Sequence, residues 1–332
     1  MYDFFYTFAP KLTNSNHQTM KRLLTIGLLA LATATNAQFN DEGKTIDALC
    51  GHKIFATVEG DLNKDGINDV FFAATSEADA TVPSYYGFYF GNKNGGYTLI
   101  KHHYDMPLTK NAKFTINDKG VLRIQNDFGN GNSDIFLFRY QNGGFYLIGG
   151  KKDRHKFDHY DFSYNFSTKK MIKTTGEGKN ATTETLEMKD LPVLKFGWFP
   201  LNWDQLEYFF DSNLDSEYKT VMGIFRLLQV KEAMHWAFCE YDNDYHNPHG
   251  SNGRYECTLD FTGGSYWVYE TLKFIKKSDD VWEIEYFSEG GERTYEEYTE
   301  DNGETFSGPS NGEATNSSTE DFSFEDGIFV YG

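Results

Sequence analysis

The chain has little of what many catalytic and redox proteins place at their sites. It contains 3 cysteines in 332 residues and no Cys-x-x-Cys pair, which argues against a cysteine metal cluster. It has no phosphate-binding loop, dinucleotide-binding glycine pattern, nucleophile elbow or His-Glu-x-x-His motif. Basic residues are few: 31 Lys and Arg stand against 49 Asp and Glu, a formal charge of −18. This balance argues against nucleic acid and anionic membrane surfaces as partners.

Long hydrophobic runs are also absent, apart from one near the start. Leu23 to Ala34 follows the basic segment Met20-Lys21-Arg22 and precedes the small-residue segment Thr35-Asn36-Ala37. This order predicts a secretory signal peptide over residues 20–37, with residues 1–19 as a misassigned upstream start. The run is too short to span a bilayer, and no cysteine follows it to carry a lipid. We therefore expect an exported protein, periplasmic or extracellular, without a membrane span.

One short stretch places oxygen-bearing side chains at alternate positions around a single glycine: Asp61-Leu62-Asn63-Lys64-Asp65-Gly66-Ile67-Asn68-Asp69. Calcium takes about six to eight oxygen ligands, and a glycine at the sixth position allows the loop to turn around the ion. The pattern predicts a calcium site formed by the side chains of Asp61, Asn63, Asp65 and Asp69 and by the Ile67 carbonyl. The alternative is a plain hairpin turn, because Asp-Gly is common turn chemistry without a metal.

The segments that flank this loop are typical of strands, not of helices. Lys53 to Val58 precedes the loop and Val70 to Ala74 follows it, while Phe72 stands where an EF-hand needs a bidentate glutamate. The run from Gly60 to Val70 resembles the calcium loop of FG-GAP and VCBS repeats, modules that build propeller blades and recur in secreted bacterial proteins. The resemblance implies a metal clamped between two strands of a blade-like hairpin, and it implies no catalytic activity.

The first half of the chain contains a weak internal repeat. The segment Asn94 to Ile100 recurs as Asn142 to Ile148, and both begin with Asn-Gly-Gly after an aromatic strand, which predicts two hairpins. The segment Asn130 to Phe136 echoes the calcium loop, but Asn126 and Phe128 occupy its first and third ligand positions, so we do not expect it to bind calcium. Two copies are too few for a closed propeller.

The apolar period changes near residue 200, after Pro192 and Pro200. Asp215 or Ser216 is placed to cap a helix. Apolar residues then recur at helical spacing, at Val221, Ile224, Phe225 and Leu228. The pattern continues less cleanly to Met234 and Phe238. An antiparallel sheet should follow, with strands over Arg254 to Phe261, Tyr266 to Lys276 and Val281 to Phe287.

Together these patterns predict a mainly β fold in two domains, because 17% of residues are aromatic and 31 are glycines. Residues 38–200 should form an antiparallel β meander, or a partial barrel or propeller-like domain, with the calcium loop. Residues 201–332 should form a smaller α+β domain with an acidic C-terminal region. Composition favours flexibility over Asn302 to Glu320, followed by a closing hairpin that turns at Glu325-Asp326-Gly327. An acidic interaction tail is the alternative.

Several further candidates compete with ordinary structural roles. Cys239 and Cys257 are the more plausible disulfide pair. Metal-capable side chains gather in residues 153–161 and 240–249, and Glu232 with His235 has the spacing of half a di-iron site. For each cluster the alternative is a solvated loop or a structural histidine. Six aromatic residues could stack on sugar rings, and the alternative is that they belong to the core: Tyr85, Tyr86, Trp198, Trp203, Trp267 and Trp282.

The absence of a catalytic signature favours an exported, calcium-binding protein that acts as a non-catalytic binding or structural module. Its ligand would be a glycan or a protein. The alternative is a secreted hydrolase with carboxylate chemistry between the two domains. A pocket with two facing carboxylates of perturbed pKa would favour the enzyme, whereas a flat aromatic or acidic surface would favour binding.

Overall fold

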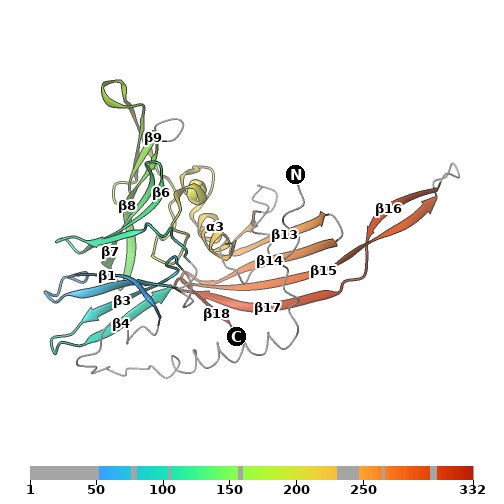
Figure 1. Cartoon of the computed structure of the whole chain (residues 1–332), viewed down its shortest axis with the longest axis horizontal. Helices are drawn as coiled ribbons and strands as arrows, with labels where there is room; N and C mark the ends of the chain where they lie inside the picture. Colours follow the sequence, from blue (N-terminus) through green and yellow to red (C-terminus); the bar gives the residue numbers. More distant parts are fainter. Residues whose placement is uncertain are drawn as a thin grey trace. The chain divides into compact units, whose positions relative to one another are not determined.

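The computed structural model describes residues 52–75, 81–103, 106–155, 160–229, 247–263, 266–299 and 305–331. These residues form three antiparallel sheets, which Figure 1 shows in blue to cyan, in green and in orange to red. The mainly β prediction is confirmed. None of the three sheets closes on itself within the described ranges. No helix in this part of the chain is long and apolar enough to cross a membrane.

The first two sheets are simple meanders in which neighbours in sequence are neighbours in the sheet. The first contains β1 (Ile54–Gly60), β2 (Asp69–Ala74), β3 (Tyr85–Gly91) and β4 (Tyr97–His103). The second contains β5 (Lys113–Ile116), β6 (Val121–Gly129), β7 (Asn132–Gln141), β8 (Gly144–Arg154), β9 (Tyr160–Asn165), β10 (Lys170–Thr175) and β11 (Thr182–Glu187). A single turn of 3-10 helix, η1 (Gly178–Asn180), joins β10 to β11.

The third sheet follows two helical segments, η2 (Trp203–Phe210) and α3 (Ser216–Gln229). Its strands are β12 (His249–Ser251), β13 (Arg254–Gly263), β14 (Tyr266–Ser278), β15 (Val281–Thr299), β16 (Thr305–Asn311), β17 (Asn316–Glu325) and β18 (Ile328–Tyr331). The C-terminal part of β15, from Arg293 to Thr299, pairs with β16 as a two-stranded ribbon (Figure 1). The N-terminal part, from Val281 to Gly290, pairs with β17.

Turn chemistry places the hairpins where the sequence predicts them. Asn142 and Gly143 have φ angles of 50° and 80° between β7 and β8, the left-handed pair that a two-residue hairpin turn requires. Asp326 and Gly327 repeat this arrangement between β17 and β18, with φ angles of 45° and 87°. The hairpin between β7 and β8 and the closing hairpin are therefore confirmed. The hairpin between β3 and β4 is confirmed by the pairing of its strands, and Gly95 in its turn has a φ of 85°.

The predicted helix is confirmed over Ser216–Gln229, as α3. The Asp215 carboxylate caps it by accepting the Tyr218 amide at 2.8 Å. The apolar stripe that gave the prediction is buried and packs toward the third sheet, where the rings of Phe225 and Phe274 lie 6.4 Å apart. The predicted continuation to Met234 and Phe238 lies outside the described residues.

Residues 302–320 were predicted to be flexible, but the described part of this segment consists largely of strands. Thr305–Asn311 forms β16 and Asn316–Glu325 forms β17. Both strands pair with β15, whose 19 residues are long enough to supply a partner for each. Cross-strand backbone hydrogen bonds therefore outweigh the weak strand propensity of a Gly-, Ser- and Asn-rich composition.

Most of the buried apolar residues from Leu62 to Phe324 form one continuous cluster. A second, smaller cluster consists of Val70, Phe72, Ala74, Tyr85 and Tyr89. The predicted division into two domains near residue 200 stays a prediction, although this core runs across it. The six aromatic residues considered as a sugar platform are all at most 8% exposed. The core role is therefore confirmed for these six residues, and they do not form an exposed sugar-stacking platform.

Cys257 is a free thiol, fully buried in β13. The predicted disulfide to Cys239 is therefore absent at Cys257, and Cys239 itself lies outside the described residues. Burial raises the pKa of the Cys257 thiol, so it packs as a small apolar side chain and is not a reactive thiolate.

Two side chains of β4 hold the C-terminal turn. His103 is 2% exposed, and its Nδ1 donates to the Gly327 carbonyl at 3.1 Å. The ammonium of Lys101 lies 2.7 Å from the Asp326 carboxylate, in the same turn. Burial lowers the pKa of His103 to about 3, and the neighbouring charge of Lys101 acts in the same direction.

The folded protein is therefore expected to lose stability at acidic pH through His103. Its folded-state pKa lies below the ordinary 6.5, so the unfolded chain takes up the proton first. The contribution is complete above a pH of about 6.5 and is lost as the pH falls from there toward 3, by about 2 kcal/mol at pH 5. Urea denaturation at about pH 7.5 and pH 5 measures this loss.

His103→Asn is the matched variant, because asparagine keeps a donor near the position of Nδ1 and does not take up the proton. The difference in unfolding free energy between the two pH values should shrink by about 2 kcal/mol in this variant. An unchanged difference would assign the acid sensitivity to other groups, first to His52 and His102, whose pKa values burial also lowers.

Candidate metal centres

The loop predicted to bind calcium joins β1 to β2, and its backbone curls around its own side-chain oxygens. The Asp61 carboxylate accepts the amides of Asp65 at 3.1 Å and Gly66 at 3.0 Å. Asn63 Oδ1 also accepts the Asp65 amide at 3.0 Å, and Asp65 Oδ1 accepts that of Ile67 at 2.8 Å. Gly66 has a φ of 84°, which the sixth position of such a loop needs.

Asp69 closes the loop from a buried position. Its Oδ2 accepts the amides of Leu62 at 2.8 Å and Asn63 at 3.2 Å, and its Oδ1 accepts that of Gly91 at 3.0 Å. Burial raises the pKa of the Asp69 carboxyl, the three amide hydrogen bonds lower it, and the nearby Asp65 charge raises it again. The carboxylate thus ties the loop to the end of β3 whether or not an ion is bound.

The second sheet supports the outer side of this loop. Lys64 Nζ donates to the Asp118 carbonyl at 2.8 Å, across the turn between β5 and β6. A Cβ added at Gly120 would lie 2.5 Å from the Asp61 carbonyl oxygen, so the two turns are in close backbone contact. This support fixes the loop in a closed form, which favours a bound ion by lowering the cost of ordering it.

The five predicted ligand residues are therefore neighbours in one small loop, but its carboxylates are not tightly gathered. In the described parts of the chain, a single group brings three His, Cys, Asp or Glu ligand atoms within 4.8 Å of one another, and it lies elsewhere. The oxygens of Asp61, Asn63 and Asp65 that accept amides fit a calcium loop, since these hydrogen bonds orient the side chains inward. Ligation by the Ile67 carbonyl stays a prediction.

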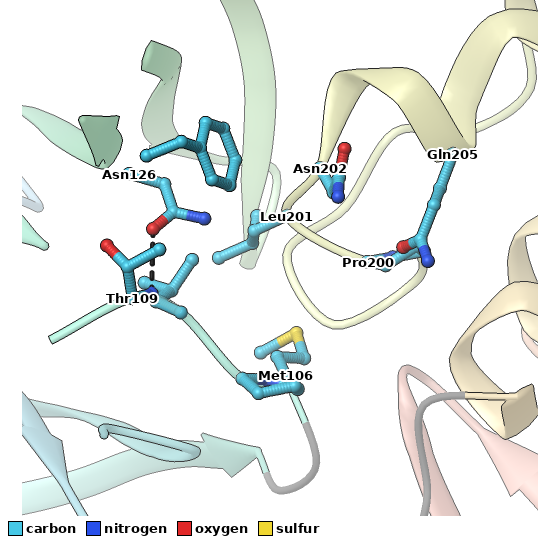
Figure 2. Close-up of a pocket in the computed structure, with 10 residues that line it drawn as sticks. Met106, Thr109, Asn126, Pro200, Leu201, Asn202 and Gln205 are labelled. Atoms are coloured by element: carbon cyan, nitrogen blue, oxygen red, sulfur yellow. Dashed lines mark hydrogen bonds between the residues drawn. The ribbon is translucent and has the colours of Figure 1, made fainter. Parts of the chain in front are cut away.

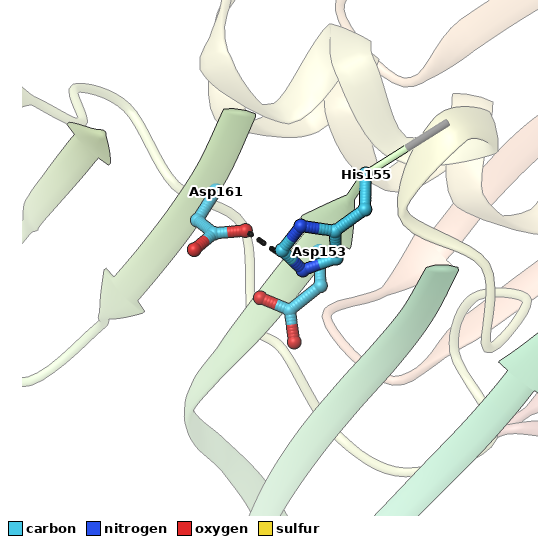
Figure 3. Close-up of side chains that lie close together, drawn as sticks. All are labelled: Asp153, His155 and Asp161. Atoms are coloured by element: carbon cyan, nitrogen blue, oxygen red, sulfur yellow. Dashed lines mark ion pairs between the residues drawn. The ribbon is translucent and has the colours of Figure 1, made fainter. Parts of the chain in front are cut away.

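The tight group is Asp153, His155 and Asp161, in the second sheet (Figure 3). Asp153 lies near the end of β8 and Asp161 near the start of β9, and their Cα atoms are direct partners across the two strands. His155 follows Asp153 by two residues, and its Nε2 lies 3.8 Å from Asp161 Oδ1. These three half-buried residues form a possible metal-binding triad.

The sequence singled out this stretch only as one of two loose clusters. The sequence does not reveal how β8 and β9 align, and it is this alignment that places Asp153 opposite Asp161. The alternation Asp-x-His followed by an aspartate across a hairpin is the signal for such a site, since residues two apart share a face of a strand. The other members of the stretch, residues 156–159, lie outside the described residues.

A positive charge already neutralises part of the triad. Lys151 forms ion pairs with both Asp153 and Asp161, the second at 3.5 Å. Burial raises the pKa of Asp161, and so do hydrogen bonding to Asp153 and the charge of that neighbour, while Lys151 lowers it. Two carboxylates directly opposite each other repel, and Lys151 alone reduces but does not remove this repulsion.

A cavity of about 460 Å³ adjoins the triad. It is lined by His155, Asp161, Thr174, Gly176, Glu177, Gly178 and Ala181. It lies beside the β10–β11 connection that contains η1. A cation at the triad would therefore have room for water or a small ligand on its open side.

A second cavity, of about 250 Å³, lies where the segment after β4 meets β6 and η2 (Figure 2). Its lining is mostly apolar: Met106, Pro107, Leu108, Thr109, Asn126, Phe128, Pro200, Leu201, Asn202 and Gln205. Asn126 Oδ1 accepts the Thr109 amide at 2.8 Å, which leaves its amide nitrogen turned toward the cavity (Figure 2). Asn126 and Phe128, at the first and third ligand positions of the repeated loop, thus line a cavity instead.

The remaining sequence candidates fall largely outside the described residues. These include Glu232 and His235, and residues 240–246 of the other metal-capable cluster. The described end of that cluster contains His249, which lies exposed in β12.

No family model, curated protein or solved structure matches this chain. The fold and its sites are thus the basis for assigning a class. They define an acidic, mainly β protein with three antiparallel sheets and a possible metal-binding triad.

Proposed function

We propose that the protein is an exported, calcium-stabilised module with a binding or structural role, related to FG-GAP and VCBS repeats. In this proposal residues 38–200 form the propeller-like domain with the calcium loop, and residues 201–332 form a smaller α+β domain. The observation that carries the proposal is the closed loop around Gly66, in which inward-turned oxygens of Asp61, Asn63 and Asp65 stand next to buried Asp69.

The ion would contribute stability and no chemistry. A divalent cation that binds the loop only in the folded state would stabilise that state. Free calcium at about 100 times its dissociation constant would stabilise the fold by roughly 2.7 kcal/mol. The proposed export is consistent with this role, because calcium loops of low affinity suit the high calcium concentrations outside cells.

Thermal unfolding with calcium and with a chelator tests the proposal. We expect the midpoint to rise by several degrees in calcium, since 1–2 kcal/mol shifts a domain of this size by about that much. Asp65→Ala should abolish the rise, because Asp65 is an exposed ligand that holds only one backbone amide.

Asp118→Ala is the matched control, since Asp118 is also an exposed aspartate, in the neighbouring turn, and it accepts the Lys64 ammonium through its backbone carbonyl. It should keep the full calcium response. A wild-type midpoint that does not move between millimolar calcium and chelator would refute the structural ion.

The second cavity supports a binding role. Phe128 is 39% exposed at its edge, and Asn126, Asn202 and Gln205 supply amide groups beside apolar walls. An exposed ring with amides around it suits a neutral ligand such as a sugar, and less so an anion, which the acidic surface repels. We therefore propose this cavity as the place where a glycan or a protein side chain binds.

The alternative is a secreted hydrolase, and one observation favours it. Asp153 and Asp161 face each other beside a cavity, and the pKa of Asp161 is raised, an arrangement that can separate an acid from a base. The pair lies on adjacent strands of one sheet instead of across two domains, and Lys151 contacts both carboxylates. We therefore prefer the non-catalytic function.

A further inference from the structure

The β8–β9 hairpin assembles a donor set that does not depend on the calcium loop. Asp153 and Asp161 are direct cross-strand partners, and His155 stands two residues after Asp153. One carboxylate oxygen from each aspartate and one imidazole nitrogen lie within 4.8 Å of one another. Such spacing lets a single ion contact all three after small side-chain rotations, given metal–ligand bonds of about 2.0–2.2 Å.

Asp161 Oδ1 is buried and accepts no hydrogen bond in the structure, whereas the buried Asp153 Oδ1 is ion-paired with Lys151 Nζ. Buried carboxylate oxygens normally have a partner, and an unpaired one marks a place for an ion or other ligand. The other oxygen of Asp153 accepts the hydroxyl of Ser133 at 3.3 Å. The side chain is therefore oriented through Oδ2, and its Oδ1 contacts the Lys151 ammonium, which a bound ion would have to displace.

Contacts with the β6–β7 turn also hold His155 in place. Its backbone amide donates to Asn132 Oδ1 at 2.9 Å, which fixes the chain as it leaves β8. A Cβ added at Gly131 would lie 3.2 Å from the His155 ring, so the β6–β7 turn packs directly against the imidazole. Contacts that fix a ligand before the ion arrives raise affinity, because less side-chain freedom is lost on binding.

We propose that Asp153, His155 and Asp161 bind a divalent first-row transition ion, with the adjoining cavity open to its remaining coordination positions. One imidazole with two carboxylates suits a borderline ion such as zinc better than calcium, which prefers oxygen alone. The site takes a different class of ion from the 61–69 loop and stands whether or not that loop binds calcium.

Lys151 gives the sharpest test, because it competes with the ion. Its ammonium contacts both aspartates, and its side chain is 39% exposed, so it can leave toward solvent. If Lys151 is the permanent counter-ion of the two aspartates, then neither wild type nor Lys151→Met should bind zinc. If a metal displaces Lys151, then Lys151→Met removes a competing charge and zinc affinity rises.

Calorimetric titration of metal-free protein with zinc, in excess calcium at about pH 7.5, measures the site. We expect one saturable zinc per chain, an affinity at least tenfold lower in His155→Gln and in Asp161→Asn, and about tenfold higher in Lys151→Met. His249→Gln is the matched control, since His249 is an exposed histidine outside the triad, and it should leave binding unchanged. Absorption of bound cobalt(II) in the visible range, lost in His155→Gln, independently reports the imidazole ligand.

The gain in Lys151→Met cannot result from misfolding, which keeps the test decisive if a triad variant folds poorly. Absence of saturable zinc binding in both wild type and Lys151→Met would overturn the proposal. So would zinc binding of equal affinity in wild type and His155→Gln. Asp65→Ala should lose its calcium response yet keep the zinc site, so failure of one proposal is distinguishable from failure of the other.

Discussion

Replacing Asp69 with alanine is expected to destabilise the protein by roughly 3–5 kcal/mol, with or without calcium. The fully buried carboxylate accepts three backbone amides, from Leu62, Asn63 and Gly91. Alanine would leave these donors without a partner, and each buried unsatisfied donor costs about 1–3 kcal/mol. Two of the three hydrogen bonds are buried, so the loss exceeds that of any exposed ligand in the loop. Urea denaturation in chelator measures it.

The comparison with Asp65→Ala separates the two roles of the loop. Asp65→Ala should cost little in chelator and remove only the calcium-dependent part, whereas Asp69→Ala should be costly in both conditions. Asp69→Asn should fall between, because one amide oxygen still accepts while the amide nitrogen faces a donor. If Asp69→Ala lost less than about 1 kcal/mol in chelator, the buried carboxylate would not be the tie between the loop and β3.

Local patterns in the sequence predict the elements whose causes are local. The hairpin at Asn142 needs two left-handed residues, and Asn-Gly supplies them. The helix that starts at Ser216 needs a cap and an apolar stripe, and both are contiguous in sequence. The 61–69 loop is likewise predictable in position, because its shape depends on residues that bond to one another within a few positions.

Features that depend on register or on distant partners could not be predicted. The Asp153–Asp161 pairing follows from how β8 and β9 align, and a slip of one residue would turn one side chain to the opposite face. The burial of Trp198 and Trp282 depends on what packs over each sheet, which composition does not reveal. The strand β16 forms only because β15 extends beyond its first partner.

Substitution of Trp203 by alanine should be about as damaging as that of Asp69, for a reason of packing. The ring is fully buried and lies between Phe136 and Tyr164, with centroids 4.5 and 4.3 Å away. Its indole N–H donates to the Ile135 carbonyl at 3.2 Å. Loss of a buried Trp leaves a large cavity and typically costs about 3–5 kcal/mol. Chemical denaturation at neutral pH measures the change.

The close fit around Trp203 explains why the core cannot collapse into that space. A Cβ added at Gly150 would lie 2.4 Å from the Trp203 ring, so β8 provides a glycine where the ring crosses the sheet. The strands on either side are held by the sheet ladder, and they cannot move inward without breaking backbone hydrogen bonds. The loss of stability in Trp203→Ala should therefore lie in the upper part of the range of about 3–5 kcal/mol.

Trp203 also connects the core to the charges on the same sheet. Its amide donates to Asp134 at 2.8 Å, and the next residue, Asp204, forms ion pairs with Lys152 and Arg154. Arg154 in turn pairs with buried Asp134 at 2.9 Å. Loss of the ring should loosen η2 and weaken these pairs, which matters because removing one partner of a buried pair is strongly destabilising.

Two variants make this prediction specific. Trp203→Phe keeps an aromatic ring in the stack and loses the hydrogen bond to Ile135, so we expect a loss of about 1–2 kcal/mol. Phe128→Ala removes an aromatic ring from the same sheet at a site that is 39% exposed, and it should cost about 1 kcal/mol or less. If Trp203→Ala were no more destabilising than Phe128→Ala, then η2 would not pack on the second sheet through this ring.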